Sequence, residues 1–228
     1  MLSRVFVIRH VERDKSNKYD PQTPTQGGLI TAFAMGTEVR KRFNPVFSYA
    51  CSSPQPRAIR TIPPFLAGVS GWSREAGLWR GEFPTIHINH DLDDFSSDTR
   101  PVVVEALKRA KNWAATYAIE TETALFLAPD CAAALELKAT EALGAVNVQG
   151  KLDGDSLLVM HGAAIEGVCI ALQINSETLA GQGMGEIGGQ FDKCEGFVAH
   201  FMNGHFVRLE QIRQPAWLRS MQFALDAL

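Results

Sequence analysis

The sequence predicts an α/β protein, a three-layer α/β/α sandwich in which helices cover both faces of a mostly parallel central sheet. Along its 228 residues, three short apolar, β-branched runs alternate with helical patterns. Unbroken apolar runs are typical of strands buried on both faces, and their alternation with helices favours parallel pairing. Near the C-terminus, β-prone arms flank Asn203-Gly204 and predict a hairpin that adds antiparallel pairing.

The first half of the chain supplies two of the buried strands. Val5 to Arg9 is the first, and a polar loop follows it. Residues 25–43 then carry a helical pattern that Pro45 ends. Residues 46–51 form the second strand candidate. A loop over residues 52–61 enters the next helix, which the prolines at 63 and 64 are expected to interrupt early.

Residues 70–100 form an irregular excursion, rich in glycine and acidic residues, with a short strand expected around residues 74–78. Its tryptophans and phenylalanines favour an ordered lid or substrate wall over disorder. Helices are predicted over residues 101–118 and 131–143, and a loop over residues 144–154.

The third buried strand, residues 156–160, ends in His161-Gly162 and precedes a helical stretch over residues 163–172. A glycine-rich loop follows at residues 181–189. It contains a GxGxxG sequence, but no strand precedes it and no clear helix follows it. It therefore fails the structural context of a dinucleotide-binding motif, and no cofactor is predicted.

Composition limits the functional classes. A hydrophobic content of 46% suits one domain over residues 1–228, and no linker or repeat divides the chain. The formal net charge of −3 gives no broad basic field, so no nucleic-acid partner is expected. Arg9 and His10 interrupt the N-terminal apolar run, and no later stretch is long enough to span a membrane. The four cysteines lack CxxC spacing and are expected to be buried thiols of a cytoplasmic protein.

Each buried strand ends in polar residues: Arg9-His10 after the first, Ser52-Ser53 with Arg57 after the second, and His161-Gly162 after the third. Functional groups of open α/β sheets gather beyond the carboxyl ends of the strands, so these residues can form one site. Arginine forks bind phosphate oxygens and stay charged, and an imidazole can be phosphorylated. The pattern indicates a phosphate pocket that contains a nucleophile.

The segments VFVIRHVER, SSPQPRAIRT and LLVMHG resemble, in order, the three core motifs of the histidine phosphatase superfamily, which has the phosphoglycerate-mutase-like fold. The resemblance implies that His10 is the phosphorylated nucleophile. It implies that Arg9, Arg57 and His161 hold the phosphoryl oxygens, with Gly162 in a supporting place.

Within the superfamily, RHVERDKSN and REAGLW most resemble the Sts/TULA-type phosphatase domains. This closer resemblance implies that Arg13 joins the pocket, that Asn17 lies nearby and that Glu75 donates the proton to the leaving group. Glu82 lies in the same excursion and is the alternative donor.

The chain departs from the family pattern at two places. Val11 stands where the family has glycine after the nucleophile, and it is expected to narrow the site or shift the backbone. The LTPxG segment of the family appears only as Pro24-Thr25-Gln26-Gly27. Neither change removes a charged group from the predicted site.

The predicted function is metal-independent hydrolysis of a phosphomonoester through phosphorylated His10. The same residues could serve a phosphoglycerate-type mutase, and Val11 favours a third alternative, a catalytically weak phosphate- or phosphopeptide-binding module. The expected partner is a small phosphoester or a phosphotyrosine-like group. Trp72, Trp79 and Phe83 suit either an aromatic entrance that favours phosphotyrosine or a bulky phosphoester, or buried packing. The sequence leaves open whether the chain is a monomer or a homodimer.

Overall fold

The structure is a computed structural model. It describes residues 1–14, 20, 22–71, 83–93, 129–162, 164–165, 168–169, 172 and 191–225, without the side chains of residues 129–138 and 222–225. The strand expected around residues 74–78, the helix over 101–118 and the glycine-rich loop over 181–189 lie outside the described residues. Of the helical stretch expected over residues 163–172, all the described residues are helical.

The described strands form one six-stranded sheet in the order β3-β2-β4-β1-β5-β6. Strands β3, β2, β4 and β1 run parallel, β5 is antiparallel to β1, and β6 is antiparallel to β5. The predicted mostly parallel sheet with a C-terminal antiparallel hairpin is therefore confirmed. The strands are β1 (Leu2–Arg9), β2 (Phe47–Ser52), β3 (Ile86–Ile88), β4 (Gly154–Met160), β5 (Gly196–Met202) and β6 (His205–Ile212).

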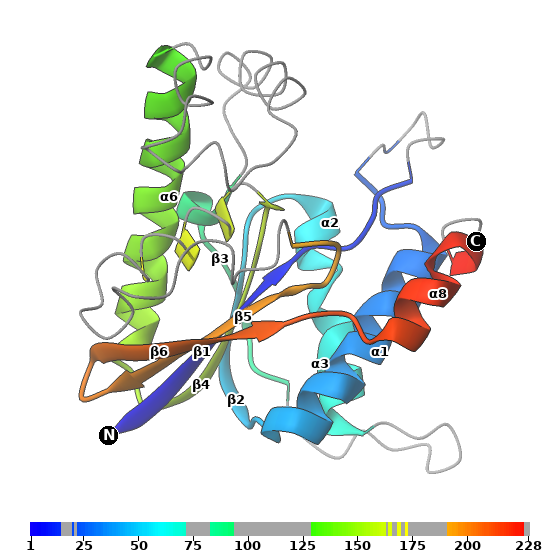
Figure 1. The fold of residues 1–228 in the computed structure, drawn as a ribbon, viewed down its shortest axis with the longest axis horizontal. Coiled ribbons are helices and arrows are strands. Elements are labelled where there is room, and N and C mark those ends of the chain that lie inside the picture. Colours follow the sequence, from blue (N-terminus) through cyan, green and yellow to red (C-terminus); the bar gives the residue numbers. More distant parts are fainter. Residues whose placement is uncertain are drawn as a thin grey trace.

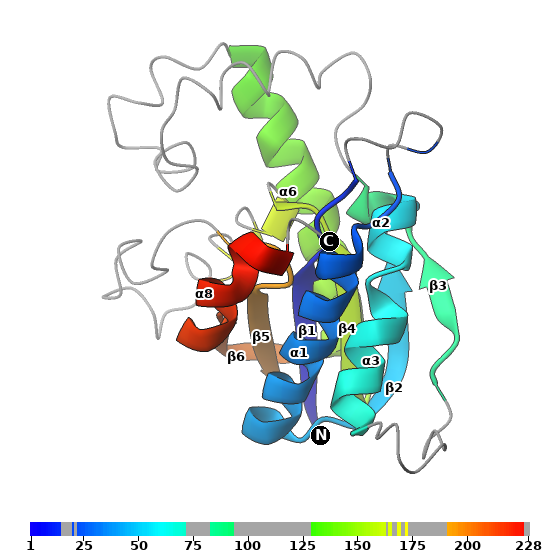
Figure 2. The ribbon, with the colours of Figure 1, turned by 90° about the vertical axis from the view of Figure 1, so that its right-hand side faces the viewer.

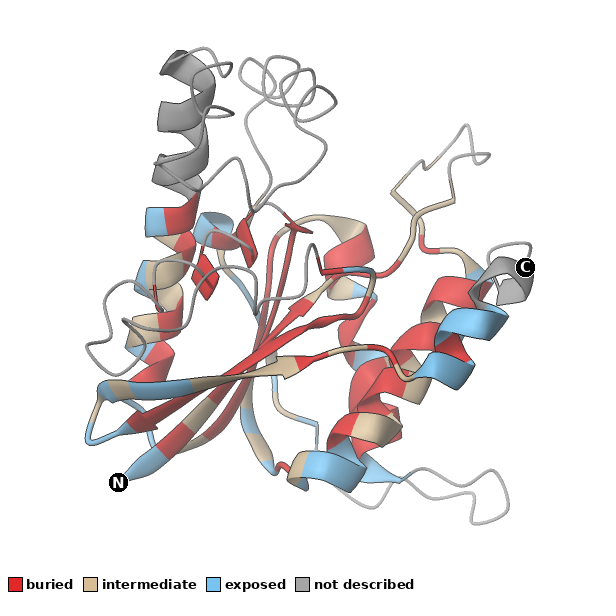
Figure 3. Cartoon of the chain, viewed as in Figure 1, coloured by how far each residue is buried: buried red, intermediate tan, exposed pale blue. Residues whose placement is uncertain are grey.

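Helices lie on both faces of the sheet, as predicted (Figures 1 and 2). One face is covered by α1 (Gln26–Phe43), α3 (Ile62–Ser70) and α8 (Ala216–Leu225), and the other by α6 (Pro129–Gly150). Side chains of β1 alternate between two cores, one for each face. Val5 and Val7 belong to the core on the α6 side, whereas Phe6 and Ile8 belong to the core beneath α1 and α3. Figure 3 shows that the central strands are buried.

Helix α1 begins and ends at recognisable caps. The Oγ1 atom of Thr25 accepts a hydrogen bond from the backbone N–H of Gly28 at 2.9 Å. At the other end, Asn44 adopts a left-handed conformation with φ 43° and its N–H donates to the carbonyl of Arg40. Pro45 follows this cap. The predicted bounds of 25–43 therefore agree closely with the structure.

Helices α1 and α3 cross closely because each has a glycine at the contact. A Cβ atom on Gly36 would lie 2.0 Å from the carbonyl oxygen of Phe65, and one on Gly68 would lie 2.0 Å from that of Phe33. Any other residue at either position would force the helices apart. The prolines at 63 and 64 were expected to interrupt a helix. They lie instead in the first turn of α3, where proline is tolerated. The short helix α2 (Pro56–Ile59) ends before them.

Two local predictions are wrong. Helix α6 continues to Gly150, through the loop predicted for residues 144–154, because Ala142 and Val146 are buried against the sheet. That packing outweighs the cost of a helical glycine at 144, about 1 kcal/mol. Strand β3 and the 3₁₀ helix η1 (His90–Leu92) lie within the segment predicted to be irregular. A three-residue strand is too short to show an alternating pattern.

The hairpin between β5 and β6 has the predicted two-residue turn. Asn203 and Gly204 both have positive φ values, 53° and 79°, as a type I′ turn requires. The side chains of three of the four cysteines are described, and all three are buried free thiols, as predicted. No described helix is both long and apolar enough to cross a membrane.

Candidate active site

The ends of β1, β2 and β4 bring three predicted segments together at one edge of the sheet. The backbone N–H of His10 donates to the carbonyl of Met160 at 3.0 Å, and that of Ser53 donates to the carbonyl of Val159 at 3.0 Å. His161 follows directly after β4. Because these strands are parallel neighbours, their carboxyl ends place His10, Ser53 and His161 side by side.

Arg57 joins the two histidines. Its Nε atom lies 3.1 Å from Nε2 of His10, and its Nη2 atom lies 3.1 Å from Nδ1 of His161. The imidazole rings have centroids 4.8 Å apart. The third nitrogen of the guanidinium, Nη1, donates to Oε1 of Gln22, a residue that the sequence interpretation did not select. Arg57 is buried, so its charge is held inside the site.

The hydrogen bonds assign the tautomers of both rings. Nδ1 of His10 lies 2.6 Å from the carbonyl oxygen of Val11, which can only accept, so Nδ1 carries the proton and Nε2 the lone pair. Nδ1 of His161 faces an Arg57 donor and is the unprotonated nitrogen. Its Nε2 therefore donates to Oγ of Ser53, at 2.9 Å.

His10 is held in its neutral form. Burial lowers its pKa well below the usual value of 6.5, and electrostatic interactions with His161, Lys193 and Arg57 lower it further. The hydrogen bond to Val11 opposes this shift only in part. A neutral imidazole with its Nε2 lone pair facing the arginine is the form that can attack an electrophile.

Arg9 adds a second buried guanidinium. Its Nη1 atom donates to the carbonyl of Phe191 at 2.5 Å, whereas its Nε atom is buried and has no hydrogen-bond partner among the described residues. Gly162 lies against the guanidinium, since a Cβ atom there would be 3.0 Å from Cζ of Arg9. An unsatisfied buried N–H group is costly, and an anion at this place would satisfy it.

Val11 fits its place without a strained backbone conformation. It has no positive φ, and its side chain is fully buried in the core beneath α1 and α3. Space for it exists because Gly28 of α1 lacks a side chain; a Cβ atom there would lie 3.1 Å from that of Val11. The Val11 N–H donates to Oγ1 of Thr61, whose hydroxyl donates to the carbonyl of Arg57. Val11 thus helps to hold Arg57.

Of the residues implied by the closer resemblance, only Arg13 is described, and it is not joined to this group. Arg13 is half-buried and forms a backbone bridge with Pro24. Within the described part of the chain, no hydrogen bond or ion pair links its side chain to His10, Arg57 or His161. Asn17, Glu75 and Glu82 lie outside the described residues.

Lys193 lies at the site although no motif pointed to it. Its Nζ atom is 3.3 Å from Oε2 of Glu12, two residues beyond the nucleophile. Burial, together with the charges of Arg9 and Arg57, lowers the pKa of Lys193 to about 8, although Glu12 partly offsets these effects. Lys193 precedes β5, and the beginning of an antiparallel strand lies at the same edge as the carboxyl ends of its parallel neighbours. The position of Lys193 just before an antiparallel strand is therefore the sequence signal that could have identified it as a site residue.

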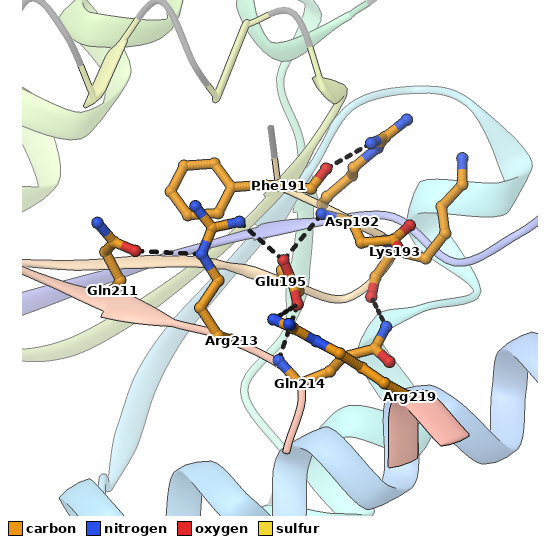
Figure 4. Close-up of polar contacts among 9 residues, drawn as sticks. Phe191, Asp192, Lys193, Glu195, Gln211, Arg213, Gln214 and Arg219 are labelled. Atoms are coloured by element: carbon orange, nitrogen blue, oxygen red, sulfur yellow. Dashed lines mark hydrogen bonds and ion pairs between the residues drawn. The ribbon is translucent and has the colours of Figure 1, made fainter. Parts of the chain in front are cut away.

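Glu195 holds the turn of residues 191–195 that carries Lys193 (Figure 4). Its buried carboxylate accepts from Arg213 at 2.9 Å, Arg219 at 3.0 Å and the backbone N–H groups of Asp192 at 3.0 Å and Gln214 at 2.9 Å. Burial alone would raise the pKa of Glu195, but these donors outweigh it and leave the pKa below 4.5. The carboxylate is therefore charged and fully engaged.

The same turn fixes Arg9. The carbonyl of Phe191 accepts the Arg9 guanidinium, and the Phe191 ring packs beneath Arg213, whose Cζ lies 4.1 Å from the ring centroid. Cys194, with φ 59°, donates its N–H to the carbonyl of Arg9. Figure 4 shows the Lys193 side chain extending away from the Glu195 carboxylate. The turn thus positions both Arg9 and Lys193.

A separate cavity of about 430 Å³ lies between α6 and strands β2 and β4. It shares no residue with the group around His10. Its described lining consists of Tyr49, Cys51, Asn89, Asp91, Gly144, Ala145, Val148, Gln149 and Leu158.

No protein-family model and no curated protein matches the chain. Solved structures match it along nearly its whole length. A phosphoglycerate mutase from Bacillus anthracis is 15% identical with a TM-score of 0.60, and the match covers 96% of each chain. A mycobacterial glucosyl-3-phosphoglycerate phosphatase is 17% identical with a TM-score of 0.55, over 93% of this chain and 99% of that one.

A phosphoserine phosphatase from Entamoeba histolytica, solved in complex with 3-phosphoglyceric acid, is 16% identical with a TM-score of 0.54, over 95% of this chain and 99% of that one. The chain therefore has the phosphoglycerate-mutase-like fold, as the sequence predicted. The finer resemblance to Sts/TULA-type domains is not shown by these structures and stays a prediction.

Proposed function

We propose that the chain is a histidine-type phosphatase that hydrolyses phosphomonoesters through a phosphorylated His10. One observation carries this proposal. Arg57 contacts both His10 Nε2 and His161 Nδ1 while the Val11 carbonyl fixes the proton on Nδ1 of His10. A neutral nucleophile is thus held beside permanent positive charge, which is what attack on a phosphate dianion needs.

In the first step, Nε2 of His10 attacks phosphorus and the bond between phosphorus and the leaving oxygen breaks. Arg57 and the unpartnered Nε–H of Arg9 would donate to the phosphoryl oxygens, together with His161. The two Arg57 donors that now face imidazole nitrogens would turn to the phosphoryl group. These guanidinium charges supply the stabilisation for which other phosphatases use a metal ion.

The leaving oxygen needs a proton, which we assign to the carboxylic acid of Glu75, with Glu82 as the alternative. In the second step, water gives its proton to that carboxylate and attacks phosphorus, and the bond between Nε2 and phosphorus breaks. A comparison of Glu75→Gln with Glu82→Gln on an ester with a poor leaving group identifies the acid, because the variant with the larger loss has lost the proton donor.

Hydrolysis of p-nitrophenyl phosphate in the presence of a chelator tests the proposal. The wild-type protein should release phosphate, and His10→Ala should abolish the release. His205→Ala, on the exposed hairpin, is the matched control and should retain full activity. A phosphoenzyme that is labile in acid and stable in base should be trapped from the wild type only. An inactive wild type, or an active His10→Ala variant, would refute the mechanism.

A mutase would use the same residues and return the phosphoryl group to another position of the substrate. Product analysis separates the two activities, because hydrolysis releases inorganic phosphate and mutase action yields an isomeric phosphoester. The expected substrate remains a small phosphoester or a phosphotyrosine-like group. Binding of phosphate without hydrolysis would favour the binding-module alternative. Val11, the residue that suggested it, fits its place without backbone strain.

A further inference from the structure

We propose that Lys193, held by Glu12, is a third cationic group of the phosphate pocket and contacts the bound anion beside Arg9 and Arg57. This inference rests on the proposed function, because it concerns the same pocket. It assigns a substrate-binding role to a residue outside the three motifs that pointed to the site.

The backbone places Lys193 next to the nucleophile. The following residue, Cys194, donates its N–H to the carbonyl of Arg9 at 3.0 Å, so Lys193 lies beside the end of β1. Its side chain reaches Oε2 of Glu12, 3.3 Å from Nζ, and Glu12 follows His10 by two residues. The ammonium group therefore lies between the turn of residues 191–195 and the loop that carries the nucleophile.

The turn holds the lysine backbone firmly. The carbonyl of Lys193 accepts from Nε2 of Gln214 at 2.8 Å, and the Gln214 N–H donates to Glu195. Since the carboxylate of Glu195 is fully occupied by other donors, it does not compete for the ammonium group. The Lys193 side chain extends away from the Glu195 carboxylate (Figure 4).

An ordinary surface ion pair does not explain this arrangement. Lys41 and Glu38 on α1 form such a pair, and the Lys41 side chain is 66% exposed. The Lys193 side chain is only 20% exposed, and two further cations, Arg9 and Arg57, face it. Placing a desolvated ammonium group beside two guanidinium groups is unfavourable unless an anion is also present.

Glu12 supplies only part of the required negative charge. Among the described residues, the charged or titratable groups that face Lys193 are Arg9, Arg57, Glu12 and His10, and His10 is neutral. These described groups comprise three cations and one carboxylate, an excess of two positive charges, which is the charge that a phosphate dianion would neutralise. This local excess of positive charge favours a bound anion beside Lys193.

Binding of inorganic phosphate, measured by calorimetry at pH 7, tests the role directly. Lys193→Met should raise the dissociation constant by about tenfold or more, the size expected for loss of a charge-assisted hydrogen bond. Lys41→Met is the matched control and should bind phosphate as the wild type does. Lys193→Arg should keep the affinity to within about threefold, because the charge remains.

The pH dependence separates anion binding from a merely structural role. Lys193 has a pKa of about 8, so wild-type phosphate affinity should fall as the pH rises through that value. The fall should be absent in Lys193→Arg, whose charge persists. In Glu12→Gln it should move to lower pH, because Glu12 raises the pKa of Lys193.

Unchanged phosphate affinity in a folded Lys193→Met variant would overturn the inference, and so would failure of the wild type to bind phosphate. If Lys193→Met does not fold, the inference is overturned when Lys193→Arg keeps the wild-type fall in phosphate affinity with pH, or when the midpoint of that fall is unchanged in Glu12→Gln. A protein that binds phosphate through Lys193 but hydrolyses no p-nitrophenyl phosphate would refute the proposed hydrolase and leave this inference standing.

Discussion

Glu195→Gln should destabilise the protein strongly although the change is nearly isosteric. The carboxylate is only 2% exposed, and two arginines and two backbone N–H groups donate to it. The amide keeps one acceptor oxygen but turns an NH₂ group toward those donors. It therefore removes the negative charge that Glu195 presents to Arg213, whose side chain is 20% exposed.

The expected loss follows from the burial of each partner. Breaking a buried ion pair by removing one member costs about 3–5 kcal/mol, and an exposed pair contributes about 0–1 kcal/mol. The Arg219 side chain is 56% exposed, so its contact adds little to the loss of the contact with Arg213. Because glutamine retains the shape and part of the hydrogen bonding, we expect a loss of about 3 kcal/mol, or roughly 6–12 °C in Tm.

Urea denaturation at several pH values measures this loss and its electrostatic origin. The folded-state pKa of Glu195 lies below 4.5, so its stabilisation is fully present above that value and disappears as the pH falls through the folded-state pKa. The difference between wild type and Glu195→Gln should therefore be constant near neutral pH and narrow below about pH 4.

Glu38→Gln, which removes the exposed pair with Lys41, is the matched control and should change stability by less than about 0.5 kcal/mol. Phosphate affinity should also fall in Glu195→Gln, because the turn that this residue holds carries the carbonyl that binds Arg9. The reasoning is refuted if Glu195→Gln is as stable as the control variant, or if the difference does not narrow in acid.

Two further substitutions test the packing around the site. Gly36→Ala should destabilise the protein by about 1–3 kcal/mol, since the new Cβ would lie 2.0 Å from the Phe65 carbonyl oxygen. Gly144→Ala in α6 should stabilise the protein by about 0.5–1 kcal/mol, because the new Cβ meets nothing within 4 Å. Shifts in Tm of the same sign for both variants would contradict this. Gly162→Ala should raise KM about threefold to tenfold with little change in Tm, because the new methyl group would displace the Arg9 guanidinium. An unchanged KM in steady-state kinetics would show that Arg9 does not bind substrate.

The sequence alone determined the central strands and the local signals that end them. The run from Val5 to Ile8 is buried on both faces, and such a strand must be apolar at every position. Asn203-Gly204 specifies its turn because both residues need positive φ. The convergence of His10, Arg57 and His161 could also be predicted, since parallel strands end at one edge. These properties are encoded over a few consecutive residues.

The tertiary structure decided what depends on partners far along the chain. Val11 packs in the space that Gly28 leaves beside it, and Gly144 lies in a helix whose neighbours Ala142 and Val146 pack on the sheet. Lys193 belongs to no motif, and it reaches the site because antiparallel pairing of β5 with β1 brings its turn back to the nucleophile. Local patterns specify the elements, whereas the charges that surround His10 are set by contacts across more than a hundred residues, which no local pattern records.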